Sequence, residues 1–159
     1  MSAQRRLWDS NVIIGYLAGQ EDLKDACENI IASAERGDVE IVIATMAMTE
    51  VAYLEGLSDE ESEMKISEFF SRNYIIPVAI DMHVAAIARR LIRKYRTGPK
   101  LKPPDAEHLA TAMQWQIPVL ETTDPDLLRL DGLERFEGHQ ENPTITIRRP
   151  FYEGTRPMF

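Results

Sequence analysis

Four acidic residues stand where an apolar run of the sequence ends or a helical pattern begins. They are Asp9, Glu50, Asp105 and Asp124. Carboxylates at such junctions can converge in a folded chain, whereas carboxylates in the middle of a helix usually face water. Carboxylates that do converge raise one another's pKa unless a cation neutralises them, and oxygen-only ligands suit Mg²⁺ or Mn²⁺. The four positions therefore predict one divalent-metal site.

A metal site of this kind would suit the hydrolysis of a phosphodiester. The ion can lower the pKa of a bound water, position that water and stabilise charge on the phosphoryl group, so no protein nucleophile is required. Taken singly, each acid has a simpler interpretation, such as Asp105 as a favourable charge in the first turn of a helix. A phosphatase that forms an aspartyl phosphate is not favoured, because the position two residues after Asp9 is Asn11. We favour the shared site, because four independent accidents would all have to fall at one end of the same sheet.

The elements that must position these acids alternate between strands and helices. Largely apolar runs predict strands at residues 39–44 and 74–80, and residues 5–8 and 118–121 are candidates for short strands. Apolar residues at helical spacing predict helices at residues 21–36, 45–56 and 105–115, after an N-cap at Ser10, and after Ser58 and Asp81. Strands that alternate with helices across short loops favour a mainly parallel sheet covered on both faces, a three-layer α/β/α sandwich. Asp9, Glu50 and Asp124 should then face the rim at the carboxyl ends of the strands.

Several large side chains are expected in the core. They are Trp8 in the first strand and Met64, Met82 and Trp115 on helices. For the two tryptophans, core packing is a better interpretation than stacking on bases. The single cysteine, Cys27, is expected to be a small buried hydrophobe, and it cannot form a disulfide within the chain.

The length and composition predict a single domain. A chain of 159 residues with 44% apolar residues can bury about two-thirds of its unfolded surface. Residues 1–137 carry the alternating pattern, and the composition changes at Gly138. Residues 138–159 are therefore predicted to form a C-terminal extension, in the same domain or as a tail, in which residues 144–148 alternate like an exposed strand. No apolar run is long enough to span a membrane, so we expect a cytoplasmic protein without a membrane partner.

A basic stretch precedes Asp105. The net charge of −8 argues against a non-specific coat on nucleic acid, which needs clustered Lys and Arg. Residues 89–102 nevertheless hold seven basic residues and no acidic one. Those expected to guide a polyanion are Arg93, Lys94, Arg96, Lys100 and Lys102. A solvated helix face followed by a basic loop is an equally good interpretation of this stretch.

Four pieces of the sequence occur in a characteristic order over residues 5–136. They are Asp9-Ser10-Asn11, Thr49-Glu50-Val51, residues 105–112 and residues 123–127. This ordered set resembles the PIN-domain ribonucleases, and within them the VapC-like toxins of bacterial toxin–antitoxin pairs. The resemblance implies endonucleolytic cleavage of RNA, with the same four acids as ligands of Mg²⁺ or Mn²⁺. It also implies a homodimer and, for a toxin, an antitoxin whose extended segment covers the site.

The resemblance gives supporting roles to neighbours of the acids. Asn11 and Thr123 would orient carboxylates or waters by hydrogen bonding. Asp126 could complete the metal shell or cap the short helix at residues 127–129, and we favour the cap. His108 could be a base or a ligand, but a structural hydrogen bond is the favoured interpretation. Two alternatives to a toxin remain: an RNA-processing PIN nuclease, and a non-catalytic RNA-binding or scaffold module, which would normally have lost one or more of the acids.

Overall fold

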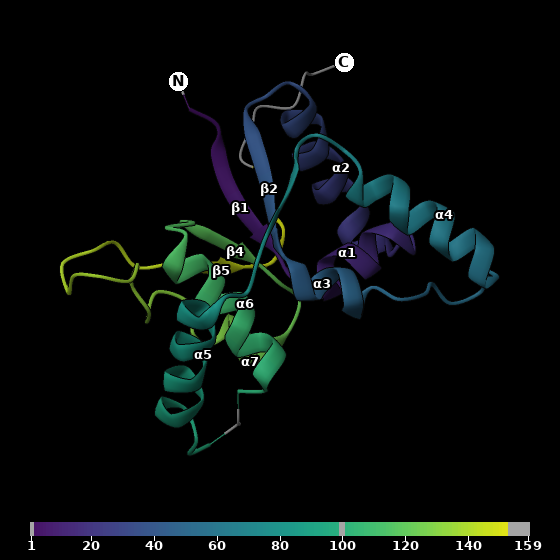
Figure 1. Cartoon of the computed structure of the whole chain (residues 1–159). Helices are drawn as coiled ribbons and strands as arrows, with labels where there is room; N and C mark the ends of the chain where they lie inside the picture. The colour runs from purple at the N-terminus through teal and green to yellow at the C-terminus, as the bar shows by residue number, and fades with distance from the viewer. Residues whose placement is uncertain (1, 99–100, 153–159) are drawn as a thin grey trace.

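The computed structural model describes residues 2–98 and 101–152 of the chain (Figure 1). The strands of this part of the chain form one parallel sheet in the order β3-β2-β1-β4-β5. They are β1 (Gln4–Trp8), β2 (Val39–Ala44), β3 (Ile75–Val78), β4 (Val119–Glu121) and β5 (Thr146–Arg148). Strand β1 pairs with β2 on one side and with β4 on the other, so it is the central strand. The predicted parallel sheet is confirmed.

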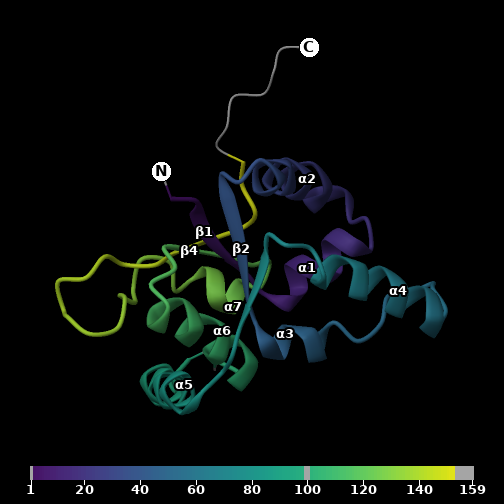
Figure 2. The same ribbon diagram turned by 45° about the horizontal axis from the view of Figure 1, so that its top comes forward.

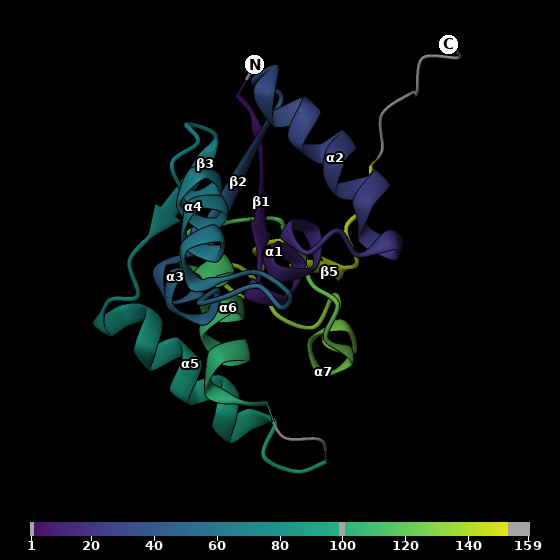
Figure 3. The same ribbon diagram turned by 90° about the vertical axis from the view of Figure 1, so that its right-hand side faces the viewer.

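Helices cover both faces of this sheet. They are α1 (Ser10–Leu17), α2 (Glu21–Glu35), α3 (Thr45–Glu50), α4 (Asp59–Phe70), α5 (Met82–Lys94), α6 (Pro103–Gln114) and α7 (Pro125–Leu128). Successive strand residues point to opposite faces, so Leu7 packs with α5, α6 and α7, whereas Trp8 packs with α1 to α4. Figure 2 shows the two groups of helices on opposite sides of β2, and Figure 3 shows α5 beside α6. The predicted three-layer α/β/α sandwich is confirmed. No helix in the described part of the chain is long and apolar enough to cross a membrane.

Three local predictions agree with the structure. The hydroxyl of Ser58 accepts the Glu61 N–H at 3.1 Å, and the Glu61 carboxylate accepts the Ser58 N–H at 3.2 Å, which completes a capping box at the start of α4. Pro77 lies in β3, an edge strand, where its missing N–H is tolerated. Cys27 is buried, and burial raises the pKa of its thiol to about 12, so it remains protonated at neutral pH.

Two helix boundaries differ from the prediction. Ser10 is the first residue of α1 rather than its N-cap, because the carboxylate of Asp9 accepts the Val12 N–H at 3.1 Å and takes the capping role. The helix that follows β2 ends at Glu50 rather than at Gly56. This short helix leaves Glu50 at its free end, one and a half turns beyond the rim of the sheet.

The predicted core is correct at Trp8 and wrong at three other positions. Trp8 is fully buried, whereas Met64, Met82 and Trp115 are 75%, 85% and 44% exposed. Met64 lies away from the side of α4 that buries Phe69, and Met82 is the first residue of α5, before its buried face begins. Trp115 is the C-cap of α6 and lies beyond its last turn. Apolar spacing alone does not show which part of a helix meets the sheet.

The C-terminal region adds a strand to the sheet. Strand β5 pairs with β4, and Ile145 and Ile147 are buried against the core, so the expected exposed strand is wrong at these residues. An isolated antiparallel bridge joins Arg135 to Thr144 before β5 begins. The division of the chain at residue 137 stays a prediction, and residues 153–159 lie outside the described residues.

Candidate active site

The acidic residues gather where the order of the strands reverses. From β1 the chain passes to β2 on one side of the sheet, while β4 lies on the other side, so the reversal falls between β1 and β4. Asp9 directly follows β1, and Asp124 lies three residues beyond the end of β4. In open parallel sheets, ligands bind outside the carboxyl ends of the strands at such a point. The fold therefore brings both residues to a usual position for a ligand site.

Asp9 is buried, and both of its carboxylate oxygens accept hydrogen bonds. Oδ1 accepts the Val12 N–H at 3.1 Å, and Oδ2 accepts a hydrogen bond from the Thr122 hydroxyl. Burial raises the pKa of Asp9 above its ordinary value, the two hydrogen bonds and the nearby His108 lower it, and the charge of Asp124 raises it. The Thr122 hydroxyl also accepts the Asp124 N–H at 3.0 Å. One threonine therefore connects Asp9 to the loop that carries Asp124.

Asp105 and Asp124 form a close carboxyl pair. Asp105 lies in the first turn of α6, which begins with two prolines, and Asp124 caps α7 by accepting the Asp126 N–H at 2.9 Å. Burial, a hydrogen bond with Asp124 and the charge of Asp124 raise the pKa of Asp105 to about 7. Near neutral pH the pair holds a proton, which relieves the repulsion between the two carboxylates.

Glu50 is held by His108. His108 Nε2 lies 3.0 Å from Glu50 Oε1, and the ring is buried. This hydrogen bond lowers the pKa of Glu50 against the opposing effect of burial, and the Ser10 hydroxyl contributes a smaller lowering. Because ionised Glu50 can only accept, Nε2 is the donor, while Nδ1 of the same ring is buried without a hydrogen-bond partner among the described residues. The predicted hydrogen-bonding role of His108 agrees with the structure, and its partner is one of the four predicted ligands.

The donor set of this cluster fits a hard divalent cation. It consists of carboxylates that lie close together, because the charge of Asp124 raises the pKa of both Asp9 and Asp105, and the charge of Asp9 also raises the pKa of Asp105. A cation could replace the proton that the Asp105 and Asp124 pair holds. Within residues 2–98 and 101–152, no three His, Cys, Asp or Glu side chains already surround one point as metal ligands would.

The hydrogen-bonding support of the cluster differs from the prediction. Thr122, which the sequence did not single out, holds Asp9, whereas its neighbour Thr123 does not. Neither Asn11 nor Thr123 forms a side-chain hydrogen bond to an acid in the described part of the chain, and both line a cavity beside Glu50. Adjacent threonines at the end of a strand carry no sequence signal that tells which one faces the acid. The role of Asn11 and Thr123 in orienting water stays a prediction.

The capping role predicted for Asp126 is wrong. Helix α7 begins at Pro125, and the carboxylate that caps it belongs to Asp124. Asp126 donates its backbone N–H to that carboxylate and lies in the first turn. Its alternative role in a metal shell stays a prediction.

Comparison with known proteins identifies the family. The PIN domain description matches residues 6–133. The chain belongs to the PIN domain family. The match to VapBC2 from Rickettsia felis, bound to a promoter DNA fragment, has a TM-score of 0.66 at 14% sequence identity. It covers 92% of this chain and 98% of the VapBC2 chain. VapBC from Salmonella typhimurium has a TM-score of 0.61 at 18% identity, over 91% of this chain and 96% of its own. A toxin–antitoxin complex from Klebsiella pneumoniae has a TM-score of 0.57 at 24% identity, over 75% of this chain and 86% of its own. These likenesses show the PIN fold, and comparison with curated protein sequences gives no match.

A cavity of about 500 Å³ opens beside the acidic cluster of the PIN domain. It lies between α1 and the segment that follows α3, and Glu50 and Thr123 connect it to the cluster. Both neutral and acidic side chains line it, and Tyr53 stands at its wall. Membership of the PIN domain family supports nuclease activity, and one of the four acids, Glu50, lines this cavity.

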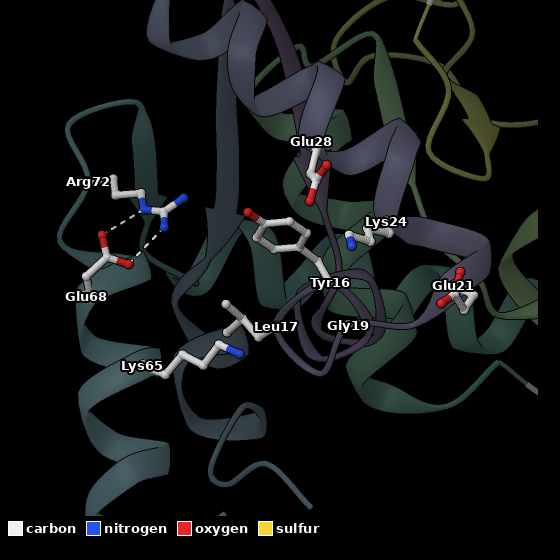
Figure 4. A pocket seen from close by; sticks show the side chains of 9 residues that line it. All are labelled: Tyr16, Leu17, Gly19, Glu21, Lys24, Glu28, Lys65, Glu68 and Arg72. Carbon is white, nitrogen blue, oxygen red and sulfur yellow. Dashed lines mark hydrogen bonds and ion pairs between the residues drawn. The ribbon is translucent and has the colours of Figure 1, made fainter.

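A smaller pocket of about 240 Å³ lies between α1, α2 and α4 (Figure 4). Its charged side chains balance one another: Glu21, Glu28 and Glu68 against Lys24, Lys65 and Arg72. Arg72 donates two hydrogen bonds to Glu68, at 3.0 and 2.8 Å (Figure 4). Because its charges cancel and none of the predicted site residues lines it, we assign this pocket no part in the chemistry of the PIN domain.

The basic stretch before Asp105 is partly neutralised. Lys94 lies 2.6 Å from the carboxylate of Glu134. Arg93 and Arg96 are exposed and form no ion pair with the described residues. Lys102 is also exposed, and Lys100 lies outside the described residues. Arg93 and Arg96, on and just after α5, and Lys102 are therefore the candidates for contact with a polyanion among the described residues.

Replacing Asp105 by asparagine is expected to stabilise the metal-free PIN domain at alkaline pH. The folded pKa of about 7 exceeds the ordinary value of 3.8, so protonation of Asp105 favours the folded state. This contribution is complete below the unfolded pKa and is lost as the pH rises through about 7. Urea unfolding in EDTA should show a gain on the order of 1–2 kcal/mol at about pH 8 and almost none near pH 4.

Asp25 provides the matched control for that measurement, because it is exposed on α2. Asp25→Asn should change the free energy of unfolding little at either pH. A gain of equal size at both pH values in Asp105→Asn would contradict the carboxyl pair.

Proposed function

We propose that this PIN domain is a metal-dependent endoribonuclease that hydrolyses RNA phosphodiester bonds, and that it is the toxin of a toxin–antitoxin pair. The observation that carries the proposal is the pairing of Asp105 with Asp124 at the reversal of strand order, where burial, and then the neighbouring Asp124, raise the pKa of Asp105 to about 7. Carboxylates packed in this way are unfavourable without a cation, and Mg²⁺ or Mn²⁺ suits oxygen ligands that retain waters. Membership of the PIN domain family supports the nuclease activity.

Each acid would contribute to holding the cation in its own way. Asp9 would be the fixed ligand, because both of its oxygens are already oriented by hydrogen bonds. Asp105 and Asp124 would release their proton in favour of the cation. Glu50 would be held in place by His108, which is buried and engaged and therefore unsuited to act as a base. When bound, the cation lowers the pKa of a water and stabilises charge on the phosphoryl group.

The test is incubation of the purified protein with a mixed RNA pool in Mg²⁺, Mn²⁺ or EDTA. We expect cleavage with either metal and none in EDTA. If the folded protein, free of any antitoxin, binds RNA without cutting it, the nuclease proposal is overturned. That result would favour the non-catalytic binding module instead.

The proposed toxin role draws on the structural neighbours. One of them is a toxin–antitoxin complex from Klebsiella pneumoniae, and two others are VapBC assemblies. We propose a protein antitoxin whose extended segment covers the acidic cluster, and a homodimer of the PIN domain. Growth arrest on expression of the chain alone, relieved by a coexpressed partner, would support the toxin. Cleavage without any growth effect would indicate an RNA-processing nuclease.

His108→Leu is expected to lower RNA cleavage about 10- to 100-fold, the range for loss of a hydrogen-bonding partner of a metal ligand. The reason is that Glu50 ends a short helix and is held by the His108 donor. His108→Gln, which can still donate, should recover most of the activity. His83→Leu, at an exposed histidine on α5, is the matched control and should cut at the wild-type rate. Full activity in His108→Leu would show that Glu50 needs no such support.

Neutralising Arg93 and Arg96 together is expected to weaken RNA binding and to flatten its salt dependence. Each lost phosphate contact on single-stranded RNA reduces the slope of log affinity against log salt by about 0.7. The measurement is the affinity for an RNA oligonucleotide across a salt series. Lys24→Gln, at an exposed lysine on α2, is the control. If the slope of log affinity against log salt is unchanged in the double variant, the basic stretch is a solvated helix face that does not contact RNA.

A further inference from the structure

We propose that the cavity beside the acidic cluster binds one unpaired base of the RNA, which stacks on Tyr53 and is read by the side-chain amides of Asn11 and Gln20. This inference rests on the proposed nuclease function and specifies where a nucleotide next to the cut lies. The volume of about 500 Å³ falls within the range of roughly 300–1,000 Å³ typical of small-molecule sites.

The cavity adjoins the acidic cluster at Glu50. Glu50 belongs to its wall, as does Thr123, the residue before Asp124. Asn11 also lines it and lies two residues after Asp9. Figure 3 shows α1 and α3, the two helices that border it, next to each other. A phosphate held at the acids would therefore leave its neighbouring nucleoside at this cavity.

The chemistry of the lining favours a base over a phosphate. Among the described residues, the cavity is lined by no Lys or Arg, whereas Glu50 and Glu55 both contribute to it. Phosphates bind where Lys and Arg cluster, so a phosphate would be repelled here. A neutral base would not be repelled. The amides of Asn11 and Gln20 each offer a donor and an acceptor to the edge of a base.

Tyr53 presents an aromatic face from a fixed backbone. Its side chain is 64% exposed, and in the described part of the chain its ring contacts no other aromatic ring. Leu54, the next residue, and Val51, two residues before Tyr53, are buried. The Ser62 hydroxyl accepts the Leu54 N–H at 3.0 Å and donates to the Leu54 carbonyl at 3.4 Å. Unpaired bases stack on exposed aromatic side chains that are held in this way.

The side-chain amide of Gln20 lies against α1, where Gly15 has no side chain. A Cβ atom on Gly15 would overlap Gln20 Oε1, so the amide occupies the space that any other residue would fill. The Gln20 N–H also donates to the Gly15 carbonyl at 2.9 Å. The cavity therefore has both a stacking face and a positioned group that can read a base.

The first arm of the experiment measures stacking without cleavage. RNA oligonucleotides with 2-aminopurine at successive positions are titrated with the Asp9→Asn variant, which should leave the RNA uncut. Fluorescence should be quenched at one position, and adding Tyr53→Ala should remove that quenching and weaken binding about tenfold. Tyr53→Phe should restore both. Trp115→Ala, at another exposed aromatic residue beyond the opposite end of α6, should change neither.

The second arm measures cleavage of a randomised RNA pool by the otherwise unmodified enzyme. Tyr53→Ala should lower kcat/KM about tenfold. Asn11→Ala and Gln20→Ala should instead flatten the base preference at one position beside the cut. Absence of cleavage by the wild-type protein would refute the proposed nuclease, while the fluorescence arm would still decide the base site. If the wild type cuts RNA and Tyr53→Ala keeps its quenching, affinity and kcat/KM, the cavity serves another ligand, such as a partner protein's side chain, and the inference is overturned.

Discussion

Asp9→Asn and Asp105→Asn are each expected to reduce metal-dependent RNA cleavage by more than about a hundredfold. Loss of an outer hydrogen-bonding partner of a metal ligand already costs about 10- to 100-fold, and these changes remove the charge of a proposed ligand itself. Asn remains a good N-cap, so Asp9→Asn should preserve the start of α1. Asp105→Asn removes a carboxyl whose pKa is raised to about 7, so it should not weaken the fold. The measurement is single-turnover cleavage in Mg²⁺, with circular dichroism to verify folding.

Asp25→Asn is the control for both variants, because it removes the same charge from an exposed position on α2. It should cut RNA at the wild-type rate. If Asp9→Asn and Asp105→Asn also cut at the wild-type rate, the four carboxylates are not the catalytic site, whatever nuclease activity the chain has.

Arg6→Met is expected to lower the free energy of unfolding by about 3 kcal/mol. Arg6 and Glu121 form a buried ion pair at 3.0 Å, and Arg6 also donates to the Phe151 carbonyl at 2.6 Å. Glu121 further accepts hydrogen bonds from the Trp8 indole and the Phe151 N–H. Breaking a buried pair leaves one charge without compensation, which typically costs about 3–5 kcal/mol. We take the lower value because Arg148 lies 3.6 Å from the same carboxylate.

The loss in Arg6→Met should depend on pH. Burial already raises the pKa of Glu121, against the opposing charge of Arg6, and removing Arg6 raises it further. A raised folded pKa favours folding at low pH, so the loss should be full above that pKa and smaller as the pH falls through it. Arg6→Met combined with Glu121→Leu should recover most of the stability, because an apolar pair can replace a buried ion pair. Urea unfolding measures each variant, with Arg5→Met as the control on the same strand. If Arg6→Met alone has the same free energy of unfolding as the wild type, the burial of this ion pair is contradicted.

The sequence predicts the architecture because its signals are local. Strand β2 is apolar at every position except Glu40, which is typical of a parallel strand buried on both faces. Asp9 directly follows the apolar residues Leu7 and Trp8, so its place at the rim follows from the end of β1. Helix spacing is a weaker guide, because it does not show which turn of a helix meets the sheet. For this reason Met64 and Met82 are exposed where the spacing predicts burial.

The connections within the site could not be read from the sequence. His108 and Glu50 are 58 positions apart, and Thr122 and Asp9 are 113 apart, so no local pattern links either pair. Glu121 has the sequence of an ordinary strand end, yet it is fully buried. Acids at junctions therefore indicate where a site lies, whereas the side chains that hold them depend on the packing of distant elements.

The chemistry of the cut RNA ends tests the central claim most directly. If the acidic cluster acts through a divalent cation and water, the wild-type protein in Mg²⁺ should leave linear phosphate and hydroxyl ends, and EDTA should abolish cleavage. Attack by the RNA 2′-hydroxyl is not expected, because the histidine of the cluster, His108, is buried and engaged with Glu50. Cyclic 2′,3′-phosphate ends that form equally well in EDTA would contradict the account.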